Sequence, residues 1–130
     1  MTVIVTGATS FIGRAVVKAL LEEGCRVVAV SRPASAGAGK LQELFEDLKE
    51  ELQAKAWLHL GWDGAGSDKR KDVKLQEKNI GYALQSLHTA AALGCKRFLF
   101  SGSQAEYGIC NEWMKEEQEC HPVSEYGKDK

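Results

Sequence analysis

Tyr126 and Lys130 have types and a spacing that could perform chemistry, because they stand four positions apart. On a helix, that spacing puts both side chains on one face. A phenol, with an ordinary pKa of ~10, is a poor base at neutral pH. A neighbouring ammonium lowers the pKa of a phenol and makes a tyrosine usable in acid–base catalysis. Such a pair also occurs by chance, and Ser103, at the end of a predicted strand, adds a third polar group to the catalytic hypothesis.

A glycine-containing turn near the N-terminus is typical of a phosphate-binding site. The segment 6–13, with the sequence TGATSFIG, separates a predicted strand from a predicted helix. Backbone N–H groups and the positive end of the helix converge on such a turn, where a Rossmann fold binds pyrophosphate. Gly7 would allow the tight turn and Gly13 the close packing of the helix, while Ser10 stands where a middle glycine is usual. The pattern predicts a dinucleotide site, and the alternative is an ordinary strand-to-helix turn.

The end of the second predicted strand bears on the choice of cofactor. Ser31 and Arg32 stand there. An NAD-specific site usually has an acidic residue at this point for the ribose 2′-OH, whereas an arginine accommodates a 2′-phosphate. The sequence therefore favours NADP over NAD, unless Arg32 is simply a solvated side chain.

The elements that must position these residues alternate between strand and helix. Short apolar runs predict strands, and apolar residues at helical spacing predict helices. This alternation implies βαβ units, a parallel sheet with the first strand central, and right-handed crossovers that place helices on both faces. The predicted strands are Val3–Thr6, Arg26–Ser31, Ala56–Leu60 and Lys96–Ser101, and the predicted helices are Ile12–Glu23, Leu41–Leu52 and Asn79–Leu93.

Composition restricts the class of protein further. The chain has 130 residues, 44% hydrophobic and 27% charged, as in a soluble globular domain. A net charge of −1 gives no basic excess for nucleic acid, and no run of ~18 apolar residues predicts a membrane span. The N-terminus enters a strand without a signal peptide, which favours the cytoplasm. The four cysteines lack C-x-x-C spacing and the histidines lack ligand spacing, so we expect neither disulfides nor a metal.

The sequence ends at Lys130, inside a predicted helix start. We therefore expect residues 1–130 to form one dinucleotide-binding domain whose C-terminal substrate domain is absent, and to lack catalysis in isolation. A sheet edge without its neighbouring strands favours self-association, so a homo-oligomer is expected. We also expect the Lys130 ammonium to lie in solvent, where a charge pair at ~4 Å is worth only about 1 kcal/mol.

Taken together, these motifs resemble the extended short-chain dehydrogenase/reductase family, in its NAD-dependent epimerase/dehydratase group. The resemblance implies that Tyr126 is the acid/base and that Lys130 lowers its pKa and anchors the ribose. Ser103 would hydrogen-bond the reacting oxygen, and Asn79 matches a helix asparagine that helps to hold the lysine through water. The segments that carry the resemblance are 6–7, 11–14, 59–62, 79, 93–98, 102–108 and 125–128. The cofactor-binding residues that it implies are Gly7, Thr9, Ser10, Phe11, Ile12, Gly13, Ser31, Arg32, Leu60, Gly61 and Lys130.

The function that the resemblance implies is an NAD(P)-dependent epimerase, dehydratase or reductase that acts on a sugar nucleotide, with hydride transfer and a tyrosine acid/base. Gln104 and Ala105 stand where dehydratase members carry an acidic pair, which argues against simple 4,6-dehydration. The alternatives are a dinucleotide-binding module without chemistry, or an inactive N-terminal fragment.

The sequence also departs from the family's pattern. Gly61 and Trp62 replace paired alanines, and Trp62 either lines the active-site cleft or is structural. The family's third strand, whose end carries an Asp, is expected between residues 33 and 55. Asp47 and Leu48 are a candidate remnant of it, but helical periodicity is stronger there, so the alternative is a sheet that lacks this strand. Trp57 and His59 lie within an apolar strand and are predicted to belong to the core.

Overall fold

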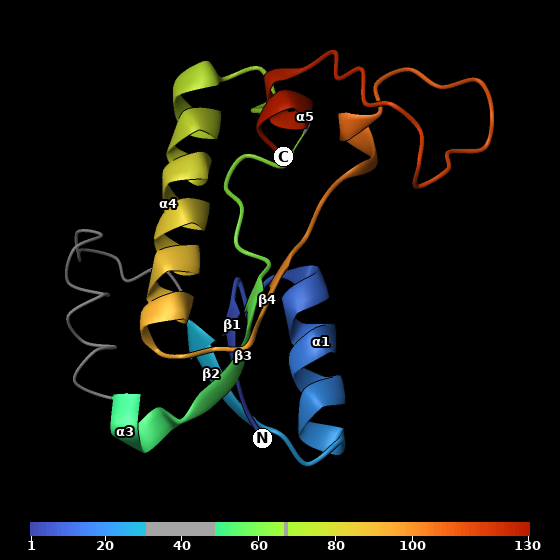
Figure 1. Cartoon of the computed structure of the whole chain (residues 1–130). Coiled ribbons are helices and arrows are strands. Elements are labelled where there is room, and N and C mark those ends of the chain that lie inside the picture. The colour runs from blue at the N-terminus through green and yellow to red at the C-terminus, as the bar shows by residue number, and fades with distance from the viewer. Residues whose placement is uncertain (31–48, 67) are drawn as a thin grey trace. The chain divides into compact units, whose positions relative to one another are not determined.

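The computed structural model describes residues 1–30, 49–66 and 68–130 (Figure 1). These residues form two compact units. The first unit comprises Met1–Gly61 and Tyr82–Ser101, and the second comprises Trp62–Gly81 and Gly102–Lys130.

A four-stranded parallel sheet is the framework of the first unit. The strand order is β2-β1-β3-β4, so the first strand has a neighbour on each side. The register pairs Val3 with Val27 of β2 and with Ala56 of β3, and Trp57 with Phe98 of β4. The prediction of a parallel sheet with a central first strand is confirmed. The strands are β1 (Thr2–Thr6), β2 (Arg26–Val30), β3 (Ala54–His59) and β4 (Arg97–Phe100).

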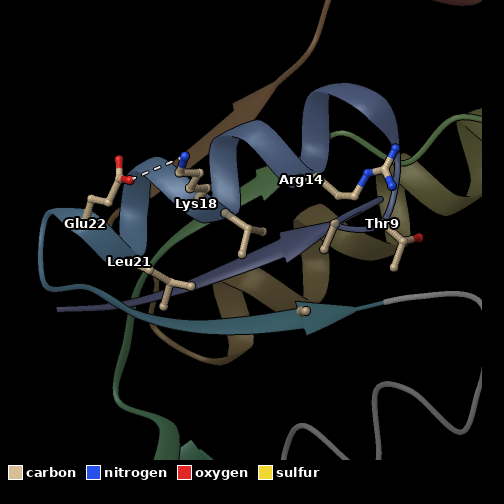
Figure 2. A pocket seen from close by; sticks show the side chains of 8 residues that line it. Thr9, Arg14, Lys18, Leu21 and Glu22 are labelled. Carbon is tan, nitrogen blue, oxygen red and sulfur yellow. Dashed lines mark ion pairs between the residues drawn. The ribbon is translucent and has the colours of Figure 1, made fainter.

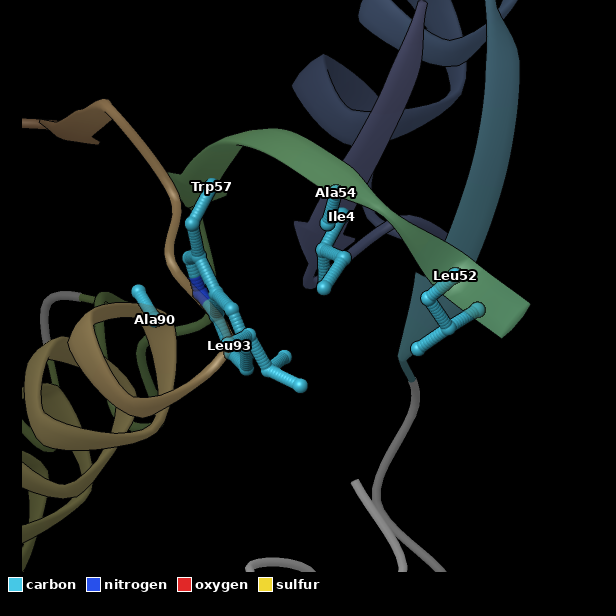
Figure 3. Packing of buried hydrophobic residues seen from close by; sticks show 6 residues of the cluster. All are labelled: Ile4, Leu52, Ala54, Trp57, Ala90 and Leu93. Atoms are coloured by element: carbon cyan, nitrogen blue, oxygen red, sulfur yellow. The ribbon is translucent and has the colours of Figure 1, made fainter. Parts of the chain in front are cut away.

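Helices cover both faces of this sheet, as predicted. Because successive side chains of a strand point to opposite faces, β1 presents apolar side chains to a helix on each face. Ile4 lies on one face, in a cluster with Trp57, Ala90 and Leu93 (Figure 3). On the other face, β1 packs against Val17 and its neighbours in α1 (Phe11–Glu22). Full burial of one such aliphatic side chain is worth roughly 1.5–3 kcal/mol. The first unit is therefore a doubly wound, Rossmann-type sheet.

The helix α4 (Val73–Ala92) begins six residues before the predicted start at Asn79. Asp72 caps the N-terminus of α4, because its Oδ1 accepts a hydrogen bond from the Leu75 N–H at 3.1 Å. The first two turns of α4 consist mainly of Lys, Gln and Glu, which are good helix formers without an apolar stripe. Periodicity alone therefore placed the start too late, although Gly94, with φ +77°, follows the helix as expected.

Part of the prediction falls on residues that the structure does not describe. Of the predicted helix Leu41–Leu52, only its end is described, as α3 (Lys49–Leu52). Ser31 and Arg32 lie outside the described residues, and so does most of the region in which the family's third strand was expected.

The second unit contains the short 3-10 helix η1 (Gln104–Glu106) and the helix α5 (Glu125–Asp129). Gly127 of α5 is buried, and a Cβ there would collide with the carbonyl oxygen of Ala105. Gly127 therefore lets α5 pack directly on η1.

Candidate functional site

The turn after β1 is built around Gly7. Its φ of +68° lies in the left-handed region that favours glycine. Its N–H donates to the Val30 carbonyl oxygen at 3.2 Å, which ties the turn to the end of β2. A Cβ on Gly7 would lie 2.7 Å from the backbone nitrogen of Gly61. Conformation and close backbone approach therefore both require glycine here.

Ser10, at the position of the usual middle glycine, caps α1. Its backbone is extended, and its Oγ accepts a hydrogen bond from the Gly13 N–H at 3.0 Å. A Cβ on Gly13 would collide with the carbonyl oxygen of Gly7. The two glycines therefore let the first turn of α1 pack against the loop, as the sequence predicts.

The N-terminal end of α1 is open to solvent. Thr9 and Ser10 are exposed, and the side chains of Phe11 and Ile12 are 87% and 60% exposed. A helix N-terminus carries partial positive charge and unpaired N–H groups, which attract phosphate. The residues predicted to bind the cofactor phosphates thus lie together on one surface of the first unit, and their role stays a prediction.

Buried polar contacts connect this turn to the end of β3. The Thr6 hydroxyl shares a hydrogen bond with His59 Nδ1 at 3.0 Å and accepts one from the Gly61 N–H at 3.3 Å. The Leu60 N–H donates to the Thr6 carbonyl oxygen. His59 is 3% exposed and stacks on Phe100, so its assignment to the core is confirmed, as is that of Trp57. Thr6 therefore places Leu60 and Gly61 beside the glycine turn.

A hollow of about 540 Å³ lies beside α1 and β2 (Figure 2). Thr9 and Arg14 line it at one end of α1, and Lys18 and Glu22 form an ion pair at 3.8 Å farther along the helix. Both side chains of this pair are exposed, so the pair contributes little stability. Thr9 is the one predicted cofactor-binding residue in the lining, so the hollow is not the predicted phosphate site.

In the second unit, Tyr126 lies in α5 and is 7% exposed. The Ser124 Oγ caps this helix by accepting from the Gly127 N–H at 3.1 Å. The Tyr126 N–H donates to the Arg70 carbonyl oxygen, and the Arg70 guanidinium carbon lies 4.9 Å from the centre of the Tyr126 ring. The Trp62 ring meets Tyr126 edge-on at 6.2 Å and 86°. A guanidinium and an indole thus hold the phenol ring.

Lys130 is half-buried, and the expectation that its ammonium lies in solvent is wrong. Its Nζ lies 4.3 Å from the centre of the Trp62 ring and 5.9 Å from that of Tyr126. Burial lowers the pKa of the Lys130 ammonium, and the negative charge of Glu106 acts in the opposite direction. The prediction failed because the α5 sequence contains no sign that an indole from residue 62 covers the lysine.

Ser103 begins η1 with a capping box. Its Oγ accepts from the Ala105 N–H at 3.2 Å, and its own N–H donates to Glu106 Oε1 at 2.5 Å. These bonds use the hydroxyl as an acceptor, so its hydrogen can still be donated to another group. That geometry is compatible with the predicted bond to a reacting oxygen, which stays a prediction.

Asn79 and Gln76 hold the loop that precedes α4. Asn79 is 2% exposed; its Nδ2 donates to the Asp63 carbonyl oxygen at 2.8 Å and its Oδ1 accepts from the Asp63 N–H at 2.9 Å. Gln76, which is fully buried, accepts from the Trp62 indole N–H at 2.8 Å. Asn79 therefore fixes the backbone of Asp63, in the loop that precedes α4. Its water-mediated role toward Lys130 stays a prediction.

The structure brings some predicted residues together and adds others. Tyr126 and Lys130 share the second unit with Ser103 and Asn79, whereas the glycine turn belongs to the first unit. Sequence reasoning did not assign the contacts of Arg70, Gln76 and Glu106. One usable signal was the i, i+3 spacing of two amide side chains, Gln76 and Asn79, at the start of α4.

The described residues contain no group of three His, Cys, Asp or Glu side chains that could hold a metal ion. Within the same residues, no helix is long and apolar enough to cross a membrane. The thiols of Cys25, Cys95, Cys110 and Cys120 are free.

A central first strand, a glycine turn leading into α1 and a Tyr-x-x-x-Lys pair place this chain among the short-chain dehydrogenase/reductase proteins of Rossmann type. More narrowly, the chain belongs to the NAD dependent epimerase/dehydratase family, whose sequence profile matches residues 3–130.

Characterised relatives cover almost the whole of this chain. It is 34% identical over 139 residues to dTDP-6-deoxy-L-talose 4-dehydrogenase (NAD(+)) of Aggregatibacter actinomycetemcomitans, covering 98% of this chain and 50% of that protein. It is 30% identical to UDP-glucose 4-epimerase 4 of Oryza sativa subsp. japonica, covering 99% of this chain and 42% of that protein. The chain thus spans half or less of the length of these curated relatives.

A solved structure of similar fold is UDP-glucose 4-epimerase from Thermotoga maritima with UDP-glucose. It matches with a TM-score of 0.80 and 25% identity, over 99% of this chain and 47% of that one. The UDP-glucose 4-epimerase of Bifidobacterium longum, solved with NAD+ and UDP, has a TM-score of 0.82 at 22% identity, over 99% of this chain and 45% of that one, and supports the fold alone.

Proposed function

We propose that this chain supplies the dinucleotide-binding and proton-transfer residues of an NAD(P)-dependent enzyme that epimerises, reduces or dehydrates a sugar nucleotide. The observation that carries the proposal is the Tyr126–Lys130 pair: Tyr126 is buried in α5 and the Lys130 ammonium lies over an aromatic ring. The names of the relatives contain nucleotide sugars, and this supports the proposed substrate class.

The first unit fits a dinucleotide at its glycine turn. Gly7 can carry no Cβ there, and the exposed N-terminus of α1 adjoins it. We assign binding of the cofactor phosphates to residues 7–13, with Leu60 and Gly61 beside them. A bound nicotinamide would supply hydride chemistry.

The second unit would supply proton transfer. Tyr126 takes the proton from a sugar hydroxyl when that carbon is oxidised, and returns it to the oxygen when the carbonyl is reduced. Ser103 donates its hydroxyl hydrogen to the same oxygen. Lys130, whose Nζ lies 5.9 Å from the centre of the Tyr126 ring, is the cationic partner of this tyrosine. Gln104 and Ala105 offer no carboxylate for removing water, which favours epimerisation or ketone reduction over 4,6-dehydration.

Turnover measurements on a full-length form of the protein test the proposal, because the 130 residues by themselves are expected to lack catalysis. NAD+ or NADP+ is added to the protein with UDP- and dTDP-hexoses, while product sugars and reduced nicotinamide are followed. Conversion of at least one sugar nucleotide supports the proposal that the protein is an enzyme. Tight dinucleotide binding with no conversion of any of them would instead support a binding module without chemistry.

For the cofactor, we propose a preference for NADP, which rests on Arg32 and the absence of an acid beside it in the sequence. Arg32→Asp should weaken NADP+ binding by at least about tenfold and NAD+ binding far less, because a phosphate partner becomes a like charge. Lys18→Asp, on the exposed side of α1, makes the same charge change as a control. Equal losses for both cofactors in Arg32→Asp would refute the preference.

We also propose that the protein forms a homo-oligomer. The described sheet ends in β2 and β4, and Leu99 of β4 is 50% exposed. Edge strands with apolar side chains favour self-association. Analytical ultracentrifugation that finds only monomer would contradict this part.

A further inference from the structure

We propose that Trp62 is a positioning residue for the proton-transfer pair: its indole ring holds the Lys130 side chain and orients the Tyr126 ring. This inference rests on the proposed function, because it assigns Trp62 a role toward the residues that act there. Paired alanines are expected at 61–62 from the family resemblance, so the indole belongs to this chain's own version of the site.

The first support is the geometry around the indole. The Lys130 Nζ lies 4.3 Å from the centre of the Trp62 ring, well inside the range of ~6 Å for cation–π attraction. The Tyr126 ring meets Trp62 at 86° with centres 6.2 Å apart, a favourable edge-to-face arrangement. Helix α5 has only five residues, Glu125–Asp129, and Lys130 caps its end. A short helix gives a long lysine side chain little support, so the indole supplies it.

The second support is that the indole itself is fixed. Trp62 Nε1 donates to Gln76 Oε1 at 2.8 Å. The Nε2 of Gln76 donates to the carbonyl oxygens of Gly64 at 3.2 Å and Lys69 at 3.0 Å. Two carbonyl oxygens can be satisfied only by the NH₂ side of the amide, so the Gln76 oxygen must face the indole. Gln76 is fully buried and cannot exchange these partners for water.

The third support is that the same loop also contacts Tyr126 from its other end. Arg70 Nε donates to the Ala65 carbonyl oxygen at 2.8 Å, which holds the guanidinium near the phenol ring. The Arg70 carbonyl oxygen accepts from the Tyr126 N–H. The loop that Gln76 and Asn79 fasten to α4 therefore contacts both members of the pair, and Trp62 is the part of it that contacts both side chains.

Trp62 is also unlike a core tryptophan. Trp57 of β3 is 2% exposed and belongs to an apolar cluster, whereas Trp62 is only partly buried and carries a lysine on its ring. Lys130 is itself only partly exposed, and this burial lowers its pKa.

NMR of reductively ¹³C-methylated protein tests the proposal without requiring turnover. Lysine methylation keeps the positive charge, and comparison with Lys130→Arg identifies the Lys130 methyl signal. We expect that signal to lie upfield of the other lysine signals, because a nearby aromatic ring shifts protons above its face. In Trp62→Leu it should move to the position of exposed lysines, and in Trp62→Phe only part of the way.

Trp113→Leu is the matched control, since Trp113 lies in the same unit and is 94% exposed. It should leave the Lys130 signal unchanged. The proposal would be overturned if the Lys130 signal of the methylated parent protein coincides with those of exposed lysines, or if the signal stays upfield in Trp62→Leu. If Trp62→Leu fails to fold, the partial shift in Trp62→Phe decides.

The turnover assay gives a second readout. Trp62→Leu should lower kcat by about tenfold while the KM for the sugar nucleotide stays within about threefold, because positioning acts on the chemical step. An unchanged kcat would overturn the role in positioning. Absence of turnover in the parent protein would remove the proposed function, while the NMR result would still show whether Trp62 holds Lys130.

Discussion

The glycine turn of the first unit and the tyrosine–lysine region of the second are built in different ways. The turn depends on backbone: the φ of Gly7, the approach of Gly7 to Gly61 and the cap at Ser10. The tyrosine–lysine region depends on side chains, with Tyr126 and Lys130 held by residues from 62–79. The conformation of the turn is therefore set by the local run 7–13, although Gly7 also packs on Gly61, whereas the tyrosine–lysine region depends on side chains that lie far apart in the chain.

The largest effect is expected from Gly7→Ala. A Cβ there meets the backbone of Gly61 at 2.7 Å and Leu60 at 2.8 Å, and φ is positive, so we expect a loss of about 3 kcal/mol or more in the free energy of unfolding. Gly24→Ala is the control: its φ is +72°, but a Cβ there has nothing within 4 Å, so only the backbone cost of about 1 kcal/mol applies. Urea unfolding of both variants measures the difference, and equal losses would contradict a turn limited by space.

A smaller effect is expected from Gln76→Leu in the second unit. The substitution leaves the Trp62 N–H and the carbonyl oxygens of Gly64 and Lys69 without their partner. We expect a loss of about 2 kcal/mol in the free energy of unfolding, since three partly buried polar groups lose a hydrogen bond. Gln118→Leu, which removes only a bond from the amide Nε2 to the weak acceptor Cys110 Sγ, should cost much less. If both variants unfold at the same urea concentration, the loop does not depend on Gln76.

These contrasts explain how much of the protein could be predicted from sequence. The central strand, the turn at Gly7 and the packing of Gly13 follow from a local run of residues, and the structure reproduces them. The spacing of Tyr126 and Lys130 predicted a shared helix, and the structure has Tyr126 in α5 with Lys130 as the residue that caps its end. The surroundings of Lys130 could not be predicted, because Trp62 is far from it in sequence. The start of α4 was missed because its first turns are polar and are held by a cap at Asp72.

The smallest expected effect is a pH dependence of stability from Lys130. Burial lowers its pKa in the folded state below the ordinary value of 10.5, so between the two values the unfolded chain binds more protons. Stability contributed by this group therefore rises as pH increases through that window. Between pH 8 and about 11, urea unfolding should show the free energy of unfolding of the parent rising relative to that of Lys130→Met. If the free energy of unfolding of the parent instead falls relative to that of the variant, attraction to Glu106 outweighs burial.

The most direct test of the central claim is the turnover of Tyr126→Phe, made in a full-length form of the protein, on whichever sugar nucleotide that form converts. We predict a loss of about 10²–10⁴ in kcat, with the dinucleotide affinity changed by less than about threefold, because the phenol moves a proton and contributes little to binding. Tyr82→Phe, which removes the hydroxyl of a half-exposed tyrosine on α4, should retain full activity. Near-normal kcat in Tyr126→Phe would contradict the account.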